Sequence, residues 1–106
     1  MSAAHRAGCG FVRIAFFHAF HHMLRSTPFI DALQNVLGYG GDTDTNACIV
    51  GGLVGARVGL FGIPRQTIEA VLSCDTSKGR PRPSWLSPQD ASELAQRILN
   101  EESHCP

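Results

Sequence analysis

The sequence lacks an excess of charge of either sign. Nine Lys and Arg residues balance nine Asp and Glu residues over 106 positions. Proteins that bind nucleic acid or an anionic membrane surface through bulk electrostatics carry a net positive charge or a basic patch. We therefore expect neither nucleic acid nor a membrane among the partners of this protein.

Closely spaced cysteine pairs and a secretion signal are also missing. The four cysteines, Cys9, Cys48, Cys74 and Cys105, form no Cys-x-x-Cys pair, and the first residues contain no hydrophobic stretch of a signal peptide. The apolar run 46–63 is barely long enough to span a bilayer and is interrupted by Arg57. We expect a cytoplasmic protein with reduced cysteines, in which Cys48 and Cys74 are small core residues.

No segment shows the alternation of a β-strand, whereas apolar residues recur at helical spacing along the chain. This pattern predicts an all-α fold of about five helices in a single domain, residues 1–106. The helices are expected at 11–25, 28–38, from 42–45 to about 62, from 64, and from 88. The apolar stripes expected to be buried are Val12, Phe16, Phe20 and Met23 or Leu24; Phe29, Leu33, Val36 and Leu37; Ile68, Val71 and Leu72; and Ala91, Leu94, Ala95 and Ile98.

Several helix boundaries have local signals. Thr27 and Pro28 are typical of a cap and a first helical turn, and Gly38 is expected to end that helix. Residues 87–90, Ser-Pro-Gln-Asp, resemble a capping box. Residues 74–86 are expected to be irregular, with Trp85 holding this loop to the core.

Glycines repeat every four residues in the third predicted helix, at Gly51, Gly55 and Gly59. A helix-interior glycine costs about 0.5–1 kcal/mol relative to alanine. Several together therefore indicate that one face of the helix is kept bare so that another helix packs closely against it.

Two carboxylates stand at the start of this helix, Asp42 and Asp44. A single aspartate is explained as a helix cap. Two unit charges about 4 Å apart repel by about 4 kcal/mol at an effective dielectric constant of about 20. The helix dipole stabilises each negative charge near the start of the helix by only about 0.3–1 kcal/mol. A bound cation is the simplest remedy, and these oxygen ligands suit Mg²⁺, Mn²⁺ or Ca²⁺ better than zinc.

An EF-hand is the obvious alternative, because Asp42, Asp44 and Asn46 match its first ligand positions. The pattern then fails, since Ala47 stands where the loop needs glycine and Leu53 stands where it needs glutamate.

The stretch GGDTDTNACIVGGLVGA, residues 40–56, followed by GIP at 62–64, resembles the carboxy-terminal signature of the ADP-ribosylglycohydrolase family. That family includes the dinitrogenase reductase-activating glycohydrolases and the ADP-ribosyl-acceptor hydrolases. The resemblance covers residues 10–99 and corresponds to the final portion of the longer family members. It implies an all-α fold with two divalent metals, usually Mg²⁺, in a cleft between helices.

The resemblance also implies roles for single residues. Asp42, Asp44 and Thr45 match metal ligands, and Gly40 and Gly41 match positions where the backbone passes close to bound ADP-ribose. The family's other ligands come from a Thr-Asp-Asp motif, which this sequence does not contain. The acidic residue that assists bond cleavage belongs to the same missing part, so no catalytic residue is assigned here.

Two function classes follow. The first is the metal-binding part of a Mg²⁺-dependent glycosidase-type hydrolase that splits the bond between the distal ribose of ADP-ribose and a protein side chain or other acceptor. The expected partners are then ADP-ribose or an ADP-ribosylated protein, together with a separate amino-terminal half or a second copy of the chain. Little or no activity is expected from this chain alone. The alternative is a non-catalytic all-α structural or interaction protein derived from that family.

Two further groups have less specific signals. His18 and His22 have the spacing of a zinc-chelating pair, but a solvated or half-buried helix face is the favoured interpretation. Lys78, Arg80 and Arg82 are interpreted as part of a solvated connector rather than as a phosphate-binding loop.

Overall fold

The protein was analysed as a computed structural model, which describes residues 12–102. This part contains five α-helices and no strand, so the all-α prediction is confirmed. The elements are α2 (Val12–Leu24), α3 (Phe29–Gly38), α4 (Thr43–Val58), α5 (Arg65–Leu72) and α6 (Ala91–Glu102), with the 3-10 turns η1 (Leu60–Gly62), η2 (Ser84–Leu86) and η3 (Pro88–Asp90). They fall into two compact units that divide after Pro64. The single domain over 1–106 stays a prediction.

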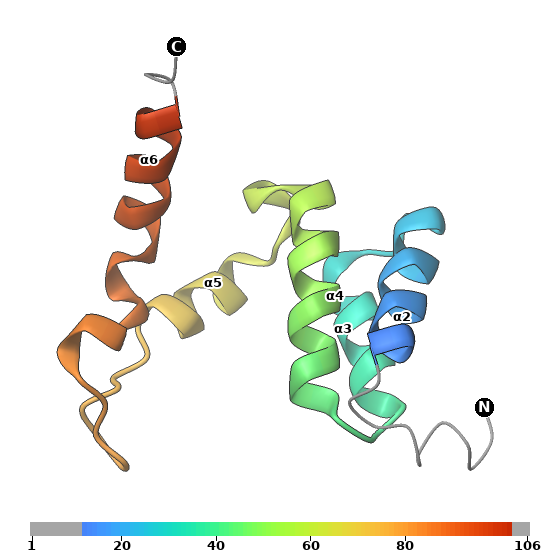
Figure 1. The fold of residues 1–106 in the computed structure, drawn as a ribbon, viewed down its shortest axis with the longest axis horizontal. Coiled ribbons are helices and arrows are strands. Elements are labelled where there is room, and N and C mark those ends of the chain that lie inside the picture. The colour runs from blue at the N-terminus through green and yellow to red at the C-terminus, as the bar shows by residue number, and fades with distance from the viewer. Residues whose placement is uncertain (1–11, 103–106) are drawn as a thin grey trace. The chain divides into compact units, whose positions relative to one another are not determined.

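The first unit is built around α4, against which both α2 and α3 pack (Figure 1). Its core is small and consists of short aliphatic side chains, namely Ala19, Ala32, Val36, Val50 and Val54. Phe29, Ala47, Leu53 and Val58 are partly buried and pack against this core. Short side chains allow the three helices to approach closely, and this arrangement fixes where α4 begins.

The buried face of α2 is not the one that we expected. Ala15, His18, Ala19 and His22 are buried. Val12, Phe16 and Phe20 are exposed. The large apolar residues gave the stronger periodic signal, but the small residues allow close packing against α4. The prediction that the phenylalanines of residues 11–20 form core is therefore wrong for Phe16, Phe17 and Phe20, and Phe11 lies outside the described residues.

His22 is held from both sides of its ring inside the first unit. Its Nε2 lies 3.0 Å from Asn35 Oδ1, and its Nδ1 lies 3.0 Å from Thr27 Oγ1. Because the amide oxygen only accepts, Nε2 donates to Asn35 and Nδ1 accepts from the Thr27 hydroxyl. A solvated helix face is therefore the wrong interpretation for His18 and His22, and both ring nitrogens of His22 are already engaged, which leaves neither for zinc.

Arg57 extends this polar network from α4. Its guanidinium donates to the carbonyl oxygen of His22 at 2.9 Å and to the carbonyl oxygen of Thr27. The acceptors lie in the last turn of α2 and in the connection to α3, where backbone carbonyls lack helical partners. Thr27 was expected to cap α3, but Pro28 holds that position and makes no side-chain cap bond. Arg57, which interrupts the apolar run, thus ties the α2–α3 corner to α4.

The glycine face of α4 is confirmed in part. A Cβ built on Gly51 would lie 3.3 Å from Leu33 Cδ2, and one on Gly55 would lie 3.6 Å from Phe29 Cε2, so both glycines face α3. Gly52 has nothing within 4 Å of such a Cβ. Gly59 has φ of +69° and ends α4 at Val58, so the expected end near residue 62 is wrong.

The second unit contains α5, η2, η3 and α6. The irregular segment expected at 74–86 is confirmed for 74–83, whereas residues 84–86 form the 3-10 turn η2. Ser87 caps η3, with its Oγ accepting from Gln89 N at 3.4 Å, and α6 begins at Ala91 rather than at the expected residue 88. The expected apolar stripe of α6 is exposed, as are Trp85, Cys48 and Cys74. The predictions that this stripe is buried, that Trp85 holds the loop to the core and that both cysteines are core residues are therefore wrong.

Within residues 12–102, no helix combines the length and apolar character needed to cross a membrane.

The α3–α4 contact predicts opposite outcomes for two neighbouring glycines. Gly52→Ala adds helix propensity without a contact and should raise the free energy of unfolding by about 0.5–1 kcal/mol. Gly51→Ala gains the same propensity but meets Leu33, so it should stabilise less or destabilise. Urea unfolding followed by circular dichroism measures both, and equal stabilisation would contradict close packing at Gly51.

The burial of His22 leads us to expect that the protein becomes less stable to unfolding as the pH is lowered. Burial lowers the pKa of His22 below its ordinary value of 6.5, and nearby basic side chains lower it further, although the bond to Asn35 raises it. The unfolded chain then binds more protons below about pH 6.5, so the free energy of unfolding should fall as the pH falls through that value. His22→Gln should flatten this dependence between about pH 7 and 5; an unchanged slope would show that His22 is not its source.

Candidate metal centre

The site begins in the short connection between α3 and α4. Tyr39 is the carboxy-terminal cap residue of α3, and Gly40 and Gly41 follow with φ of +75° each. This left-handed backbone disfavours residues with a side chain. A Cβ on Gly40 would meet nothing within 4 Å, so the protein itself does not fill the space at this position. The expected place of Gly40 and Gly41 beside bound ADP-ribose stays a prediction.

Asp42 occupies the position of a helix cap but does not act as one. It directly precedes α4, and its carbonyl oxygen accepts the first helical bond from Asn46 N at 3.0 Å. Its side chain makes no cap hydrogen bond. The ordinary structural explanation for an aspartate at this position, a side-chain cap, therefore does not account for the carboxylate of Asp42.

Asp44 lies one residue into α4, and its side chain meets that of Asp42. A side-chain hydrogen bond with Asp42 lowers the pKa of Asp44, and the backbone amide of Thr45 lowers it further. That amide donates to Asp44 Oδ1 at 2.9 Å. Asp44 and Thr45 are exposed, whereas Asp42 is half-buried. The structure thus brings together the two carboxyl groups that the sequence singled out.

Residues 42–45 carry two carboxylates and the hydroxyl of Thr45 at the start of α4. A shared proton offsets the repulsion between two close carboxyl groups, and a divalent cation does the same with more charge. Within residues 12–102, no three His, Cys, Asp or Glu side chains gather at one point. The donor set therefore fits one side of a Mg²⁺ or Mn²⁺ shell, with water in the remaining positions.

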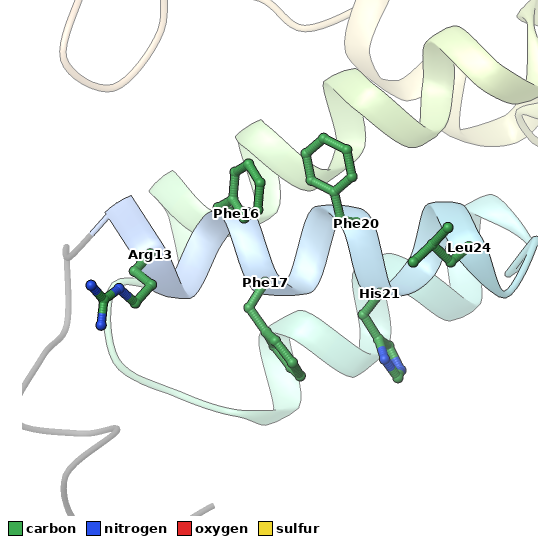
Figure 2. Close-up of a pocket in the computed structure, with 6 residues that line it drawn as sticks. All are labelled: Arg13, Phe16, Phe17, Phe20, His21 and Leu24. Carbon is green, nitrogen blue, oxygen red and sulfur yellow. The ribbon is translucent and has the colours of Figure 1, made fainter.

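The phenylalanine face of α2 is a second feature of the first unit. Figure 2 shows a hollow along this helix, lined by Arg13, Phe16, Phe17, Phe20, His21 and Leu24. The rings of Phe16 and Phe20 lie 4.4 Å apart between centroids. The hollow offers no carboxylate, so it lacks the oxygen ligands that Mg²⁺ and Mn²⁺ prefer.

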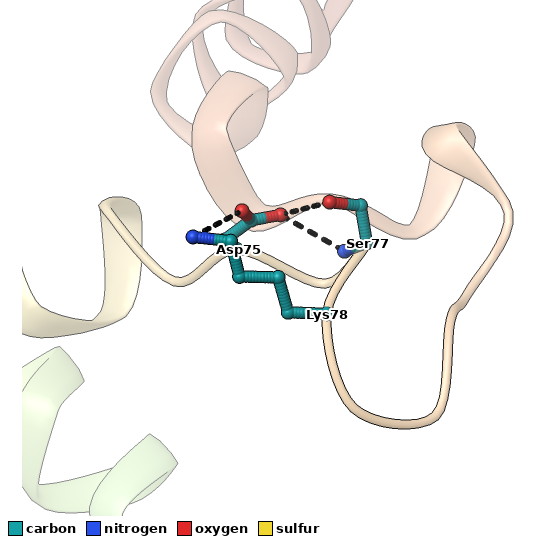
Figure 3. Close-up of polar contacts among 3 residues, drawn as sticks. All are labelled: Asp75, Ser77 and Lys78. Atoms are coloured by element: carbon teal, nitrogen blue, oxygen red, sulfur yellow. Dashed lines mark hydrogen bonds and ion pairs between the residues drawn. The ribbon is translucent and has the colours of Figure 1, made fainter.

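The basic loop of the second unit is arranged around Asp75 (Figure 3). Asp75 Oδ1 accepts from Ser77 Oγ at 2.5 Å and from Ser77 N at 3.0 Å, and Lys78 Nζ lies 3.7 Å from Asp75 Oδ2. The Ser77 hydroxyl and amide lower the pKa of Asp75. These bonds close a turn, which agrees with the favoured interpretation of a solvated connector.

Comparison with known proteins shows the family. The family model described as ADP-ribosylglycohydrolase matches residues 1–105, and this chain belongs to that family. A protein of Acanthamoeba polyphaga mimivirus with the provisional name of an ADP-ribosyl glycohydrolase is 35% identical over 69 residues. The match covers 65% of this chain and 21% of the mimivirus protein, so the chain spans about a fifth of that relative. No solved structure matches the chain.

Sequence reasoning missed polar contacts that hold the first unit together. The network of His22 with Asn35 and Arg57 was not foreseen, because its members come from three helices. Tyr39 was not singled out either, although it is the single tyrosine of the chain and directly precedes the glycine pair.

Proposed function

We propose that this chain supplies one side of the metal centre of an ADP-ribosylglycohydrolase. The reaction is hydrolysis of the bond between C1 of the distal ribose of ADP-ribose and a protein side chain or another acceptor. The observation that supports the proposal most directly is that Asp42, directly before α4, makes no side-chain cap bond. Hydrogen bonding with Asp42 lowers the pKa of Asp44 in the same first turn. Family membership supports the reaction type.

In this proposal Asp42, Asp44 and Thr45 hold Mg²⁺, with Mn²⁺ as a substitute, and the family resemblance implies two ions. A bound divalent ion supplies positive charge that orients ribose hydroxyls and stabilises the charge that develops as the bond breaks. Gly40 and Gly41 leave room for the ribose and phosphates to approach the backbone. ADP-ribose, free or attached to a protein, is the proposed ligand.

The chain holds only part of a complete shell, so we propose that it has little or no activity alone. It contains no Thr-Asp-Asp motif, which the resemblance identifies as the source of the remaining ligands. The exposed face of α2, with Phe16 60% and Phe20 45% exposed, supports a further polypeptide surface in the working protein. We propose that this surface comes from a separate segment with those ligands, and a second copy of the chain is the alternative.

Metal titration tests the site itself. Calorimetry should show weak but saturable Mn²⁺ binding to the wild type, because few protein ligands hold the ion and water fills the rest of its shell. Asp44→Asn and Asp42→Asn should each weaken Mn²⁺ binding by about tenfold or more, because each removes one negative charge and leaves a single carboxylate to attract the cation.

Asp75→Asn is the matched control. Asp75 is also exposed and also has a lowered pKa, but it belongs to an isolated turn. The Asp75→Asn variant should therefore bind Mn²⁺ with the same affinity as the wild type. Equal heats for the wild type, Asp44→Asn and Asp75→Asn would refute the metal centre.

An activity assay tests whether the chain is sufficient. Release of ADP-ribose from peptides ADP-ribosylated on arginine or serine should be undetectable with Mg²⁺ and this chain alone. Sedimentation velocity on the same sample reports whether the chain is monomeric or self-associated. Metal-dependent turnover that is lost in Asp44→Asn would contradict the proposed dependence on a further segment.

A further inference from the structure

The α2 helix contacts the start of the metal loop through one pair of rings. The centroid of the His18 imidazole lies 4.7 Å from that of the Tyr39 ring, with 56° between the ring planes. His18 is 1% exposed, whereas Tyr39 is 39% exposed. The ring of Tyr39 is thus held on its inner side by a fixed, buried group and is open to solvent on its outer side.

Backbone bonds from Gly40 N to Leu37 O at 3.3 Å and from Thr43 N to Gly41 O at 2.9 Å restrain the loop, but its next two residues add no side-chain contact. Gly40 and Gly41 have no side chains to pack, and glycine has the widest backbone freedom of any residue. On the far side of the loop, Asn46 is 5% exposed and its amide donates to Asp42 O at 3.0 Å. The loop from Gly40 to Asp42 is therefore held at one end by Tyr39 and at the other by the first turn of α4.

We infer that His18 and Tyr39 form a positioning pair that sets the backbone of residues 40–42 and so fixes where the Asp42 carboxyl lies relative to that of Asp44. This inference rests on the proposed metal centre. Neither ring is a ligand; both act through the loop. Without the pair, the backbone of Gly40 and Gly41 samples other conformations. Cation binding must then order this backbone, and the entropy lost in doing so lowers the affinity for the cation.

The test compares Tyr39→Ala with Tyr39→Phe. Tyr39→Ala should weaken Mn²⁺ binding by about tenfold in calorimetry and should speed hydrogen exchange at the Asn46 amide without metal. Tyr39→Phe keeps the ring and should behave like the wild type in both measurements. Leu37→Ala is the matched control, since Leu37 lies in the last turn of α3 and is 50% exposed.

A second variant tests whether Tyr39 acts through His18. His18→Leu keeps a similar volume without the ring and should weaken binding like Tyr39→Ala, and the double variant should be no weaker than either single variant. If His18→Leu does not fold, judged by circular dichroism, the two Tyr39 variants and Leu37→Ala decide the question.

The outcomes separate this inference from the proposed function. If the wild type binds no Mn²⁺ but Tyr39→Ala alone speeds exchange at Asn46, the metal centre is refuted and the loop anchor stands. If the wild type binds Mn²⁺ and Tyr39→Ala matches it in affinity and exchange, the anchor is refuted. Equal weakening by Leu37→Ala and Tyr39→Ala would also refute it, because the effect would then be a general loosening of α3.

Discussion

The proximity of the Asp42 and Asp44 carboxyl groups at the start of α4 is the constraint on which the proposed site depends. Like charges at the start of a helix are held together only where the backbone on both sides is fixed. Here the neighbouring amide of Thr45 satisfies one oxygen of Asp44, and the Asp42 side chain makes no cap bond. The pair therefore remains available for a shared proton or a cation, the two simplest ways to offset its repulsion.

The packing of α2 and α3 against α4 provides the fixed backbone. Gly51 and Gly55 let α3 approach α4 closely, which sets the distance that the loop between them has to cross. Arg57 binds backbone carbonyls at the α2–α3 corner, and His22 fills both of its hydrogen bonds within the same corner. These contacts lie at the opposite end of α4 from the carboxylates, so the helix is secured at both ends.

The sequence predicted what depends on local chemistry. The helical class, the end of α3 at Gly38 and the start of α4 follow from apolar periodicity and from the placement of proline and glycine within a few residues. The expected cap by Thr27 does not form, and the Asp42 side chain caps nothing. The sequence did not predict which face of α2 is buried, because the choice between Phe16 and Ala19 is made by the space that α4 leaves. The exposure of Trp85 and of the α6 stripe in the second unit was also not predicted, since apolar periodicity indicates a face but not what covers it. The polar contacts of His22 join residues far apart in the chain and leave no local signal.

The most direct measurement is the position at which Mn²⁺ broadens the amide resonances of the protein. A cation held by the two carboxylates should broaden the amides of residues 41–46 at low Mn²⁺ and leave those of the Asp75 turn unchanged until much higher concentrations. Broadening that begins at both places together, as expected for an ion attracted to any exposed carboxylate, would contradict a metal centre at the start of α4.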